Sequence, residues 1–141
     1  MAEDEQDFTP PEGFVRLVQR GPFTEHNGPI YGRVGEEGAV QGFLALGRHA
    51  NSLGIVHGGM MGSFLDTLLG QAVSAASKKP AVTIHLSLDY LSMARVGDWI
   101  EGRAAVTRLT RDVAFAEGQA RVGTRAIVRA TGVFKLMAAR R

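Results

Sequence analysis

The fold is constrained most by one long helical pattern in the middle of the chain, which follows a short run of glycines and polar residues. Residues 51–76 carry one carboxylate, Asp66, and open with the sequence NSLGIVHGG. From Gly58 to about Ser77, apolar residues recur at helical spacing, which predicts a helix roughly 30 Å long. Lys78-Lys79-Pro80 is expected to end it, because cations suit a helix C-terminus and proline stops a helix.

The other predicted elements are strands, apart from one short helix. Residues 30–35 and 39–47 are predicted as two strands joined by a hairpin at residues 36–38. Four further strands are predicted near residues 81–93, 98–110, 112–122 and 125–137. The order of strand, strand, helix and four strands predicts an α+β fold in which one helix covers one face of an antiparallel sheet.

The N-terminal region is predicted to contain a tail and a short helix. Residues 1–12 carry five acids and no base, and we expect a disordered acidic tail. Phe14, Leu17 and Val18 predict a short amphipathic helix that ends near Gly21, and residues 21–29 predict a loop. Because 141 residues are an ordinary size for one domain, residues 13–141 are expected to form a single domain.

Composition excludes several classes of function. The chain has no cysteine and only four histidines without a metal-binding pattern, so no disulfide, thiol nucleophile or metal site is expected. It has no apolar leader and no apolar run long enough to span a membrane, and we expect a cytoplasmic protein. The net charge is +2, and it is +7 outside residues 1–12. The bases are not interleaved with aromatic residues, which argues against nucleic acid as a partner.

Asp66 stands apart from the apolar face of the predicted helix. Its helical neighbours are small: Gly62, Ser63 and Gly70. Interior glycines weaken a helix by about 1 kcal/mol each, so their clustering indicates close approach of another backbone or of a ligand. An exposed aspartate with incidental glycines is the structural alternative. The apolar stripe expected to face the sheet consists of Met61, Phe64, Leu65, Leu68, Leu69, Ala72, Ala75 and Ala76.

His57-Gly58-Gly59 lies where the helix is predicted to begin. The first turn of a helix has unpaired N–H groups and a positive dipole end, and glycine lets a ligand oxygen approach them. Such N–H groups polarise a carbonyl and stabilise the oxyanion that forms on attack. A tight turn into the helix would also explain the glycines, and Asn51 either forms a turn or orients His57 or a ligand. Taken together with Asp66, the segment favours an active site.

These residues form the pattern N-x2-G-x2-H-G-G-x6-D, which resembles the motif of hotdog-fold thioesterases of the 4-hydroxybenzoyl-CoA and phenylacetate-degradation (PaaI-like) type. The resemblance extends from about Gly28 to Leu136 and includes residues 83–91, 94–98 and 130–134. It implies a hotdog fold, in which an antiparallel sheet wraps one long helix and two subunits pair their sheets edge to edge. It also implies active sites at the subunit boundary, with the helix carboxylate from one subunit and the His-Gly-Gly segment from the other.

The resemblance further implies an acyl-CoA thioesterase that needs no cofactor, with coenzyme A as part of its substrate. It implies that Asp66 is a general base or nucleophile and that the Gly58 N–H polarises the thioester carbonyl. Asn51 and His57 would orient the substrate or water, and Thr83 would help to position the water. The substrate-binding candidates are Gly59, Ser63 and Arg95, the last for coenzyme A phosphates.

One position departs from the family pattern: Met93 stands where relatives often have proline. The departure concerns the groove that is expected to bind coenzyme A. It does not affect the site expected around the carboxylate of Asp66.

Two other functions compete with hydrolysis. A hotdog hydratase or dehydratase needs an Asp-x4-His arrangement, whereas Gln71 stands five residues after Asp66. A binding protein that holds acyl-CoA or acyl-carrier thioesters without turnover is disfavoured by the presence of Asp66, Thr83 and His57 together. In each case we expect a homodimer or a dimer of dimers, because one helix leaves a sheet edge and the catalytic cleft unfinished.

Overall fold

The computed structural model describes residues 7–18, 20–35 and 38–138 of the chain. Before the long helix, the regular elements are β1 (Val15–Arg16), α2 (Pro22–Asn27), β2 (Tyr31–Gly35), β3 (Gly38–Leu44) and the short 3-10 helix η1 (Gly47–His49). The long helix and the later strands are α3 (Gly58–Ser77), β4 (Ala81–Tyr90), β5 (Trp99–Leu109), β6 (Val113–Val122) and β7 (Arg125–Leu136). The predicted hairpin strands and the four later strands are therefore all present, each close to its predicted bounds.

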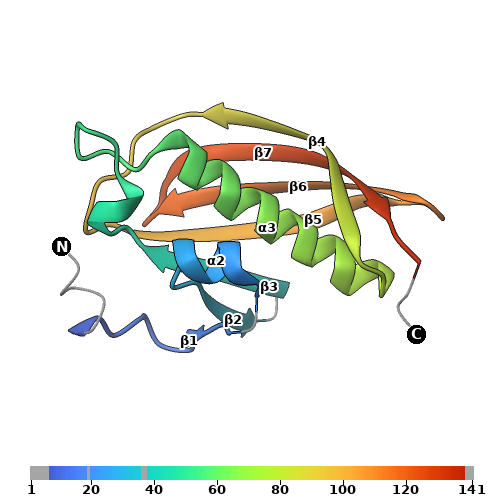
Figure 1. Cartoon of the computed structure of the whole chain (residues 1–141), viewed down its shortest axis with the longest axis horizontal. Coiled ribbons are helices and arrows are strands. Elements are labelled where there is room, and N and C mark those ends of the chain that lie inside the picture. Colours follow the sequence, from blue (N-terminus) through green and yellow to red (C-terminus); the bar gives the residue numbers. More distant parts are fainter. Residues whose placement is uncertain (1–6, 19, 36–37, 139–141) are drawn as a thin grey trace.

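Among the described residues, seven strands form one antiparallel sheet in the order β1-β2-β3-β5-β6-β7-β4. The helix α3 lies across one face of the sheet, with β4 along one flank of α3 and α2 along the other (Figure 1). This arrangement is the hotdog fold, so the predicted α+β architecture is confirmed. β4 lies at an edge of the sheet and pairs with β7 on one side.

The helix α3 begins and ends where the sequence predicts. His57 caps its N-terminus, and Lys78 follows its last turn in the left-handed conformation, with φ 62°. The prediction is wrong at the last turn, where Ala75 and Ala76 are exposed and Val73 is buried. The residues of α3 that pack against the sheet are those with the larger side chains, because these bury more apolar surface than alanine does. The buried residues of α3 are Met60, Met61, Phe64, Leu65, Leu68, Leu69 and Val73.

Small residues on the strands let α3 lie close to the sheet. A Cβ at Gly102 would lie 2.6 Å from Leu68 Cδ2, and one at Gly118 would lie 2.7 Å from Leu69 Cδ1. Both contacts are shorter than atoms tolerate, so β5 and β6 need glycine at these positions. Buried alanines complete the surface under the helix: Ala114, Ala116, Ala120 and Ala130.

The short N-terminal helix is present, but not where the sequence places it. Residues 14–18, predicted as a helix, run extended, and β1 pairs with β2. The helix is α2, which occupies residues predicted as a loop and carries Pro22 in its first turn, where the missing N–H breaks no helical hydrogen bond. In this segment Phe14 and Leu17 pack against distant residues, whereas Val15 and Val18 are exposed, and the Phe14 ring meets Trp99 edge-on with ring centres 5.2 Å apart.

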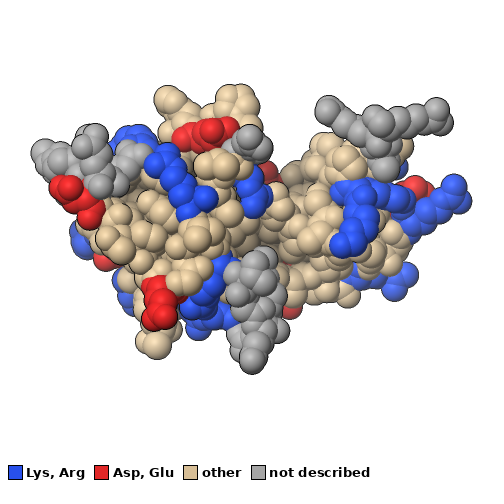
Figure 2. Space-filling view, turned by 90° about the horizontal axis from the view of Figure 1, so that it is seen from below, with Lys and Arg blue, Asp and Glu red and all other residues tan. Residues whose placement is uncertain are grey.

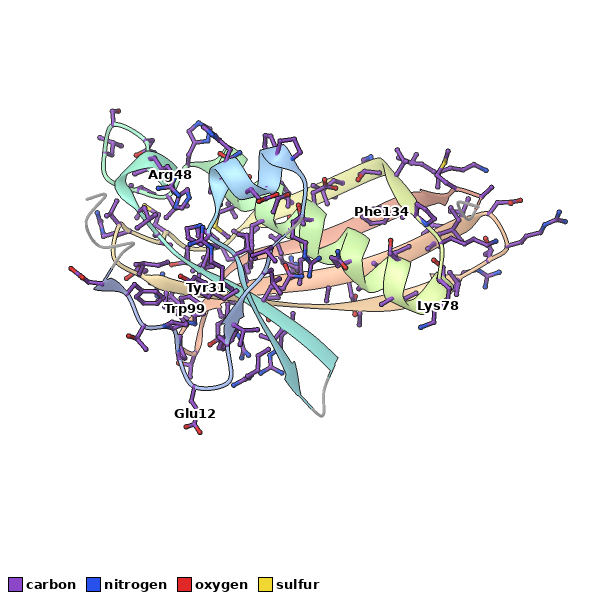
Figure 3. The ribbon with its side chains drawn as sticks, turned by 60° about the horizontal axis from the view of Figure 1, so that its bottom comes forward. Glu12, Tyr31, Arg48, Lys78, Trp99 and Phe134 are labelled. Carbon is purple, nitrogen blue, oxygen red and sulfur yellow. The ribbon has the colours of Figure 1, made fainter. Side chains whose placement is uncertain are left out.

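An aromatic cluster attaches the N-terminal segment to β2 and β5. Residues 1–6 of the expected acidic tail lie outside the described residues. Phe8, from the remainder of that tail, stacks on Trp99 with ring centres 5.5 Å apart and lies 5.9 Å from Tyr31. Tyr31 and Trp99 lie side by side, with ring centres 5.7 Å apart (Figure 3). In the strand order, β2 lies next to the end strand β1, and β5 is the central strand.

The surface of the described residues is unevenly charged. Lysine and arginine gather at one end of the molecule, where α3 ends and β5 turns back into β6 (Figure 2). We call this surface the basic end, and its exposed members are Lys78, Arg108, Arg111 and Lys135. Within the described chain, no helix is long and apolar enough to cross a membrane.

Candidate active site

His57 caps α3 with its own imidazole. The Gly59 N–H donates a hydrogen bond to His57 Nδ1 at 2.7 Å. In the neutral ring the hydrogen therefore lies on Nε2, which leaves an N–H donor on the exposed side chain. A Cβ at residue 59 would lie 2.9 Å from Nδ1, so the cap requires glycine there. The predicted Gly-Gly step thus has a structural role in addition to any role toward a ligand.

The first turn of α3 leaves one backbone donor available. The N–H groups of Met60 and Met61 both donate to the His57 carbonyl, at 2.9 and 3.2 Å. Gly59 donates to the imidazole, as described above. Among the hydrogen bonds of the described residues, none uses the Gly58 N–H. This N–H lies at the positive end of the helix dipole and can bind a carbonyl oxygen.

Asn51 is a turn residue. Its Oδ1 accepts hydrogen bonds from the Leu53 and Ile55 N–H groups, at 2.9 and 3.2 Å, which is the local pattern typical of asparagine in turns. Of the alternatives open for Asn51, the turn is the one observed in the described residues. The side-chain carbonyl group of Asn51 therefore shapes the loop that leads to His57.

A buried histidine, which the sequence analysis did not single out, holds His57 in place. The His57 N–H donates to the His49 carbonyl at 2.8 Å. The His49 ring is itself fixed, because its Nδ1 accepts from the Leu46 N–H at 3.0 Å and its Nε2 lies 2.6 Å from the Asn27 carbonyl. His49 therefore ties the loop before α3 to the end of α2. No spacing in the sequence marks this role, which depends on tertiary contacts.

Asp66 and Thr83 form a hydrogen-bonded pair between α3 and β4. The Thr83 hydroxyl donates to Asp66 Oδ1 at 2.6 Å, and the Asp66 side chain is half-buried. The small residue Gly62 brings β4 close, since a Cβ there would lie 3.2 Å from Leu88 Cδ1. The glycines beside Asp66 are thus explained at least in part by close approach of another strand.

A β-bulge in β4 turns Thr83 toward the helix. The register with β7 shifts between Thr83 and His85, which leaves Ile84 as the extra residue. Beyond the bulge, Leu86 and Leu88 pack against the core. Because side chains alternate along a strand, Thr83 would face away from α3 without the extra residue.

Two further hydrogen bonds fix the start of α3. The Tyr90 hydroxyl donates to the Gly58 carbonyl at 2.7 Å, and the Ser63 hydroxyl donates to the Gly59 carbonyl at 2.9 Å. Tyr90 lies within residues 83–91, which match the family pattern, but the sequence does not mark it as a site residue. Ser63, predicted to bind substrate, already uses its hydroxyl hydrogen within the helix.

Arg95 lies beside the loop that precedes α3. Its backbone forms an isolated bridge with Ile55, and its N–H donates to Asp98 Oδ2 at 2.8 Å. The Arg95 side chain is exposed. The residue is therefore held in place by its backbone.

The predicted site residues form two groups along α3. His57, Gly58 and Gly59 lie at its N-terminal turn, with Asn51 in the loop before them, and Asp66 lies with Thr83 further along. Gly58 and Asp66 are eight residues apart, which is about 12 Å along a helix axis. A single chain therefore does not bring the helix N-terminus and the carboxylate to one reacting bond.

Sequence comparisons identify relatives over most of the chain. Residues 53–128 match the model of the thioesterase superfamily. The presumed esterase PA0474 of Pseudomonas aeruginosa is 35% identical over 129 residues, which cover 89% of this chain and 96% of that protein. Acyl-coenzyme A thioesterase 13 of Mus musculus is 29% identical over 70 residues, which cover 49% of this chain and 50% of that protein.

Solved structures share the fold. The conserved protein PA5202 of Pseudomonas aeruginosa superposes with a TM-score of 0.77 and 20% identity, covering 86% of this chain and 100% of that chain. A Bacillus halodurans protein, BH2602, solved with coenzyme A, has a TM-score of 0.76 and 22% identity over 86% of this chain and 83% of that one. A hypothetical thioesterase of Streptococcus pneumoniae, also with coenzyme A, has a TM-score of 0.69 and 19% identity over 73% of this chain and 80% of that one.

Proposed function

Because the chain belongs to the thioesterase superfamily, we propose that it hydrolyses acyl-CoA thioesters to a free acid and coenzyme A. The motif in residues 51–66 leads us to propose the PaaI-like branch of hotdog thioesterases, acting in the cytoplasm. The acyl-CoA thioesterase 13 relative supports the same class of substrate.

The observation that carries the proposal is the hydrogen bond from Thr83 to Asp66. It fixes the orientation of the carboxylate through Oδ1 and leaves Oδ2 to accept a hydrogen bond from water. In the proposed step, Asp66 takes a proton from water while the water oxygen attacks the thioester carbonyl carbon. The carbon–sulfur bond then breaks, and the thiolate of coenzyme A leaves and takes up a proton. Direct attack by Asp66, followed by hydrolysis of the acyl-enzyme, is the alternative course.

The Gly58 N–H is proposed to bind the thioester oxygen. This donor has no competing partner among the described residues, and the helix dipole favours negative charge at its position. Charge develops on the carbonyl oxygen in the transition state, so the N–H stabilises the transition state more than the substrate. The His57 Nε2 hydrogen is available to orient the substrate from the same end of α3.

The proposed reaction requires two chains. Gly58 and Asp66 of one chain lie about 12 Å apart along α3, whereas the attacked carbon and its oxygen belong to one bond. We therefore propose that Gly58 acts together with Asp66 of the partner subunit in a homodimer or a dimer of dimers. The edge strand β4 supports this assembly, because it carries Thr83 and offers an unpaired backbone edge for a second chain.

Coenzyme A is proposed as the leaving group. The Bacillus halodurans and Streptococcus pneumoniae proteins that share the fold were solved with coenzyme A, which supports this choice. Arg95 is the residue we propose for a phosphate contact, since its side chain is exposed and its backbone pairs with Ile55 in the loop before α3.

A hydrolysis screen with thiol detection tests the proposal directly. Short, medium, long and aromatic acyl-CoAs are supplied to the purified protein, and release of free coenzyme A is followed. We expect turnover of at least one class. Tight binding of acyl-CoA without thiol release across the panel would contradict hydrolysis and favour a thioester-binding protein.

A further inference from the structure

The peptide group between Gly58 and Gly59 is hydrogen-bonded at both of its ends. Its carbonyl oxygen accepts a hydrogen bond from the Tyr90 hydroxyl at 2.7 Å, and its N–H donates to His57 Nδ1 at 2.7 Å. One peptide group therefore connects a tyrosine at the end of β4 to the imidazole that caps α3. The proposed reaction gives His57 a role toward the substrate and leaves the Tyr90 hydroxyl without one.

Glycines on α3 allow β4 to place Tyr90 beside the start of the helix. Leu88 and Tyr90 are two residues apart on β4, and Gly62 and Gly58 are one turn apart on α3. A Cβ at Gly62 would lie 3.2 Å from Leu88 Cδ1, and a Cβ at Gly58 would lie 3.3 Å from the Tyr90 hydroxyl oxygen. Two residues of a strand and one turn of a helix both span about 6 Å, so alternate residues of β4 meet successive turns of α3.

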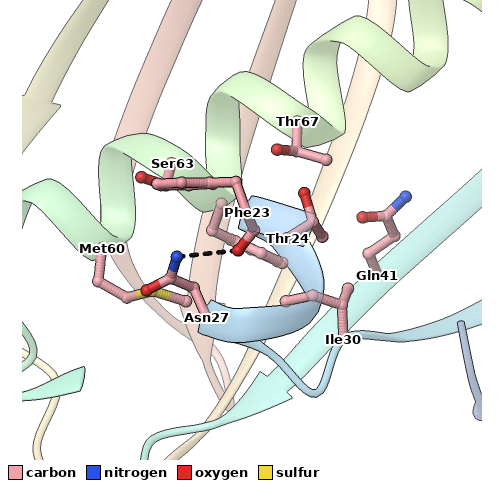
Figure 4. Close-up of a pocket in the computed structure, with 9 residues that line it drawn as sticks. Phe23, Thr24, Asn27, Ile30, Gln41, Met60, Ser63 and Thr67 are labelled. Carbon is pink, nitrogen blue, oxygen red and sulfur yellow. Dashed lines mark hydrogen bonds between the residues drawn. The ribbon is translucent and has the colours of Figure 1, made fainter. Parts of the chain in front are cut away.

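The opposite flank of α3 lies against α2, so the first turns of the helix are held from both sides. Met60, Ser63 and Thr67 line a small cavity between α3 and α2 (Figure 4). The Ser63 hydroxyl donates to the Gly59 carbonyl at 2.9 Å, which fixes the peptide group that follows. The peptide between Gly58 and Gly59 is thus held in one orientation, with its carbonyl toward Tyr90 and its N–H toward His57.

Two hydrogen bonds in series through one amide reinforce each other. A donor at the carbonyl oxygen polarises the amide, so the N–H of the same amide becomes a stronger donor to the imidazole. This second bond occupies the lone pair of His57 Nδ1 and keeps the ring hydrogen on Nε2. A neutral imidazole in this tautomer offers a hydrogen and no lone pair at Nε2. It can therefore donate to a carbonyl oxygen, but it cannot take a proton from water at that atom.

We propose that Tyr90 is a positioning residue for the reaction, which acts through the peptide between Gly58 and Gly59 to hold His57 as a hydrogen-bond donor toward the thioester oxygen. The inference rests on the proposed thioesterase function. The thioester oxygen then meets two donors at the start of α3, the Gly58 N–H and the hydrogen on His57 Nε2. Activation of water remains with Asp66 of the partner subunit, because the imidazole in this tautomer does not serve as the base.

Tyr90→Phe tests the role of the hydroxyl, because it keeps the ring that packs on Gly58. In steady-state assays with an acyl-CoA substrate, kcat should fall about threefold, the lower end of the effect of one hydrogen bond, while KM changes little. Tyr31→Phe is the matched control, since it removes the hydroxyl of the other tyrosine, which lies in the aromatic cluster. It should leave kcat unchanged. A wild-type kcat in Tyr90→Phe would overturn the proposal.

A double-mutant cycle measures whether Tyr90 acts through His57. In a His57→Ala background, Tyr90→Phe should cause no further loss of kcat, because the imidazole through which the hydroxyl acts is already absent. The same threefold loss in both backgrounds would show that Tyr90 has an effect of its own and would contradict the proposed connection.

A measurement without turnover separates this inference from the proposed function. Nitrogen-15 NMR of the His57 ring reports which nitrogen carries the hydrogen and how strongly the other one is hydrogen-bonded. The wild type should have its hydrogen on Nε2. In Tyr90→Phe, the Nδ1 resonance should move toward that of an imidazole nitrogen without a hydrogen bond, and in Tyr31→Phe it should not move. An unchanged Nδ1 resonance in Tyr90→Phe would overturn the inference. The expected shift in a protein that hydrolyses no thioester would contradict the proposed function alone.

Discussion

Single residues in the site are held by contacts from several elements. Thr83 on β4 orients Asp66, Tyr90 on the same strand holds the Gly58 carbonyl, and His49 holds the backbone of His57. The groups proposed to act on the substrate are thus positioned by neighbours that do not themselves react. Such fixed geometry is what a catalytic carboxylate and an oxyanion donor require.

At this scale, Asp66→Asn tests the proposed chemistry. Asparagine keeps the shape and accepts the Thr83 hydrogen bond, but it removes the base and the nucleophile. We expect kcat to fall at least about 10²-fold in steady-state assays, with the thermal midpoint and oligomer size little changed. Thr83→Ala should cost less, because positioning a water is secondary to activating it.

The same change at Asp89 is the control for Asp66→Asn. Asp89 lies on β4 itself, and its exposed carboxylate faces Arg129 at 3.3 Å, a surface contact of little energetic weight. Asp89→Asn should retain the wild-type rate. If Asp66→Asn also hydrolysed acyl-CoA at that rate, the carboxylate would be structural and the reaction would have to depend on His57.

Among the elements, the contact between α3 and the sheet governs where the site residues lie. Glycines on β5 and β6 allow the helix to approach, and the bulge in β4 brings Thr83 to the helix side. The position of Asp66 relative to Thr83 therefore depends on packing under the helix as well as on the strand that carries Thr83.

We expect Gly118→Ala to destabilise the protein. The added Cβ would lie 2.7 Å from Leu69 Cδ1 and 2.9 Å from the Arg103 carbonyl oxygen, which belongs to the backbone of a central strand. Overpacking of this kind costs about 1–3 kcal/mol in the free energy of unfolding, measured by urea titration. Ala105→Val on the exposed face of β5 should stay within about 0.5 kcal/mol. Equal stability of Gly118→Ala and wild type would show that α3 can shift without cost.

At the scale of the whole molecule, the protein is expected to be a homodimer or a dimer of dimers. β4 is an edge strand with the exposed apolar residues Val82 and Ile84, and exposed edges of this kind pair with other strands. Light scattering at micromolar concentration should therefore give a multiple of the 15.1 kDa chain mass. A single species of the chain mass would contradict both the assembly and the shared active site.

A positive charge introduced by substitution at the β4 edge should separate the subunits. Val82→Lys places a cation on the strand proposed to pair, and we expect loss of the oligomer together with loss of thioesterase activity. Val18→Lys makes the same change at an exposed valine near β1, on the opposite side of the sheet, and should affect neither. A monomeric Val82→Lys variant with full activity would contradict a site built from two chains.

Binding of coenzyme A should weaken as salt rises. Its phosphates are expected to meet exposed basic residues, such as Arg95 or those of the basic end, and salt screens such contacts. Calorimetric titration at low and moderate ionic strength measures the effect. Binding of an uncharged acyl thioester serves as the reference and should change little. A coenzyme A affinity that did not change with salt would favour a carrier-protein or small thioester substrate.

The sequence by itself determined the order of the long helix and of the strands from β2 to β7, and the residues at the start of α3. The bounds of α3, its His57-Gly58-Gly59 start and the strands on either side follow from local periodicity, turn residues and caps, which act over a few residues. Pairing of strands distant in sequence, and packing of side chains between them, decided the rest. Residues 14–18 do not form the predicted helix, because Val15 and Arg16 pair with β2 and Phe14 packs on Trp99 of the aromatic cluster. The helix α2 formed instead in a segment whose sequence predicts a loop.

Tertiary structure also decided which polar groups meet. In the sequence, polar residues stand at every second position from Thr83 onward: His85, Ser87 and Asp89. This spacing favours one shared face of the strand, directed away from the helix. The bulge at Ile84 reverses that face and brings Thr83 to Asp66. The burial of Gln41 likewise depends on α2 and α3 closing over β3. Local patterns do not specify such contacts, because their free energy comes from segments that are brought together only in the folded chain.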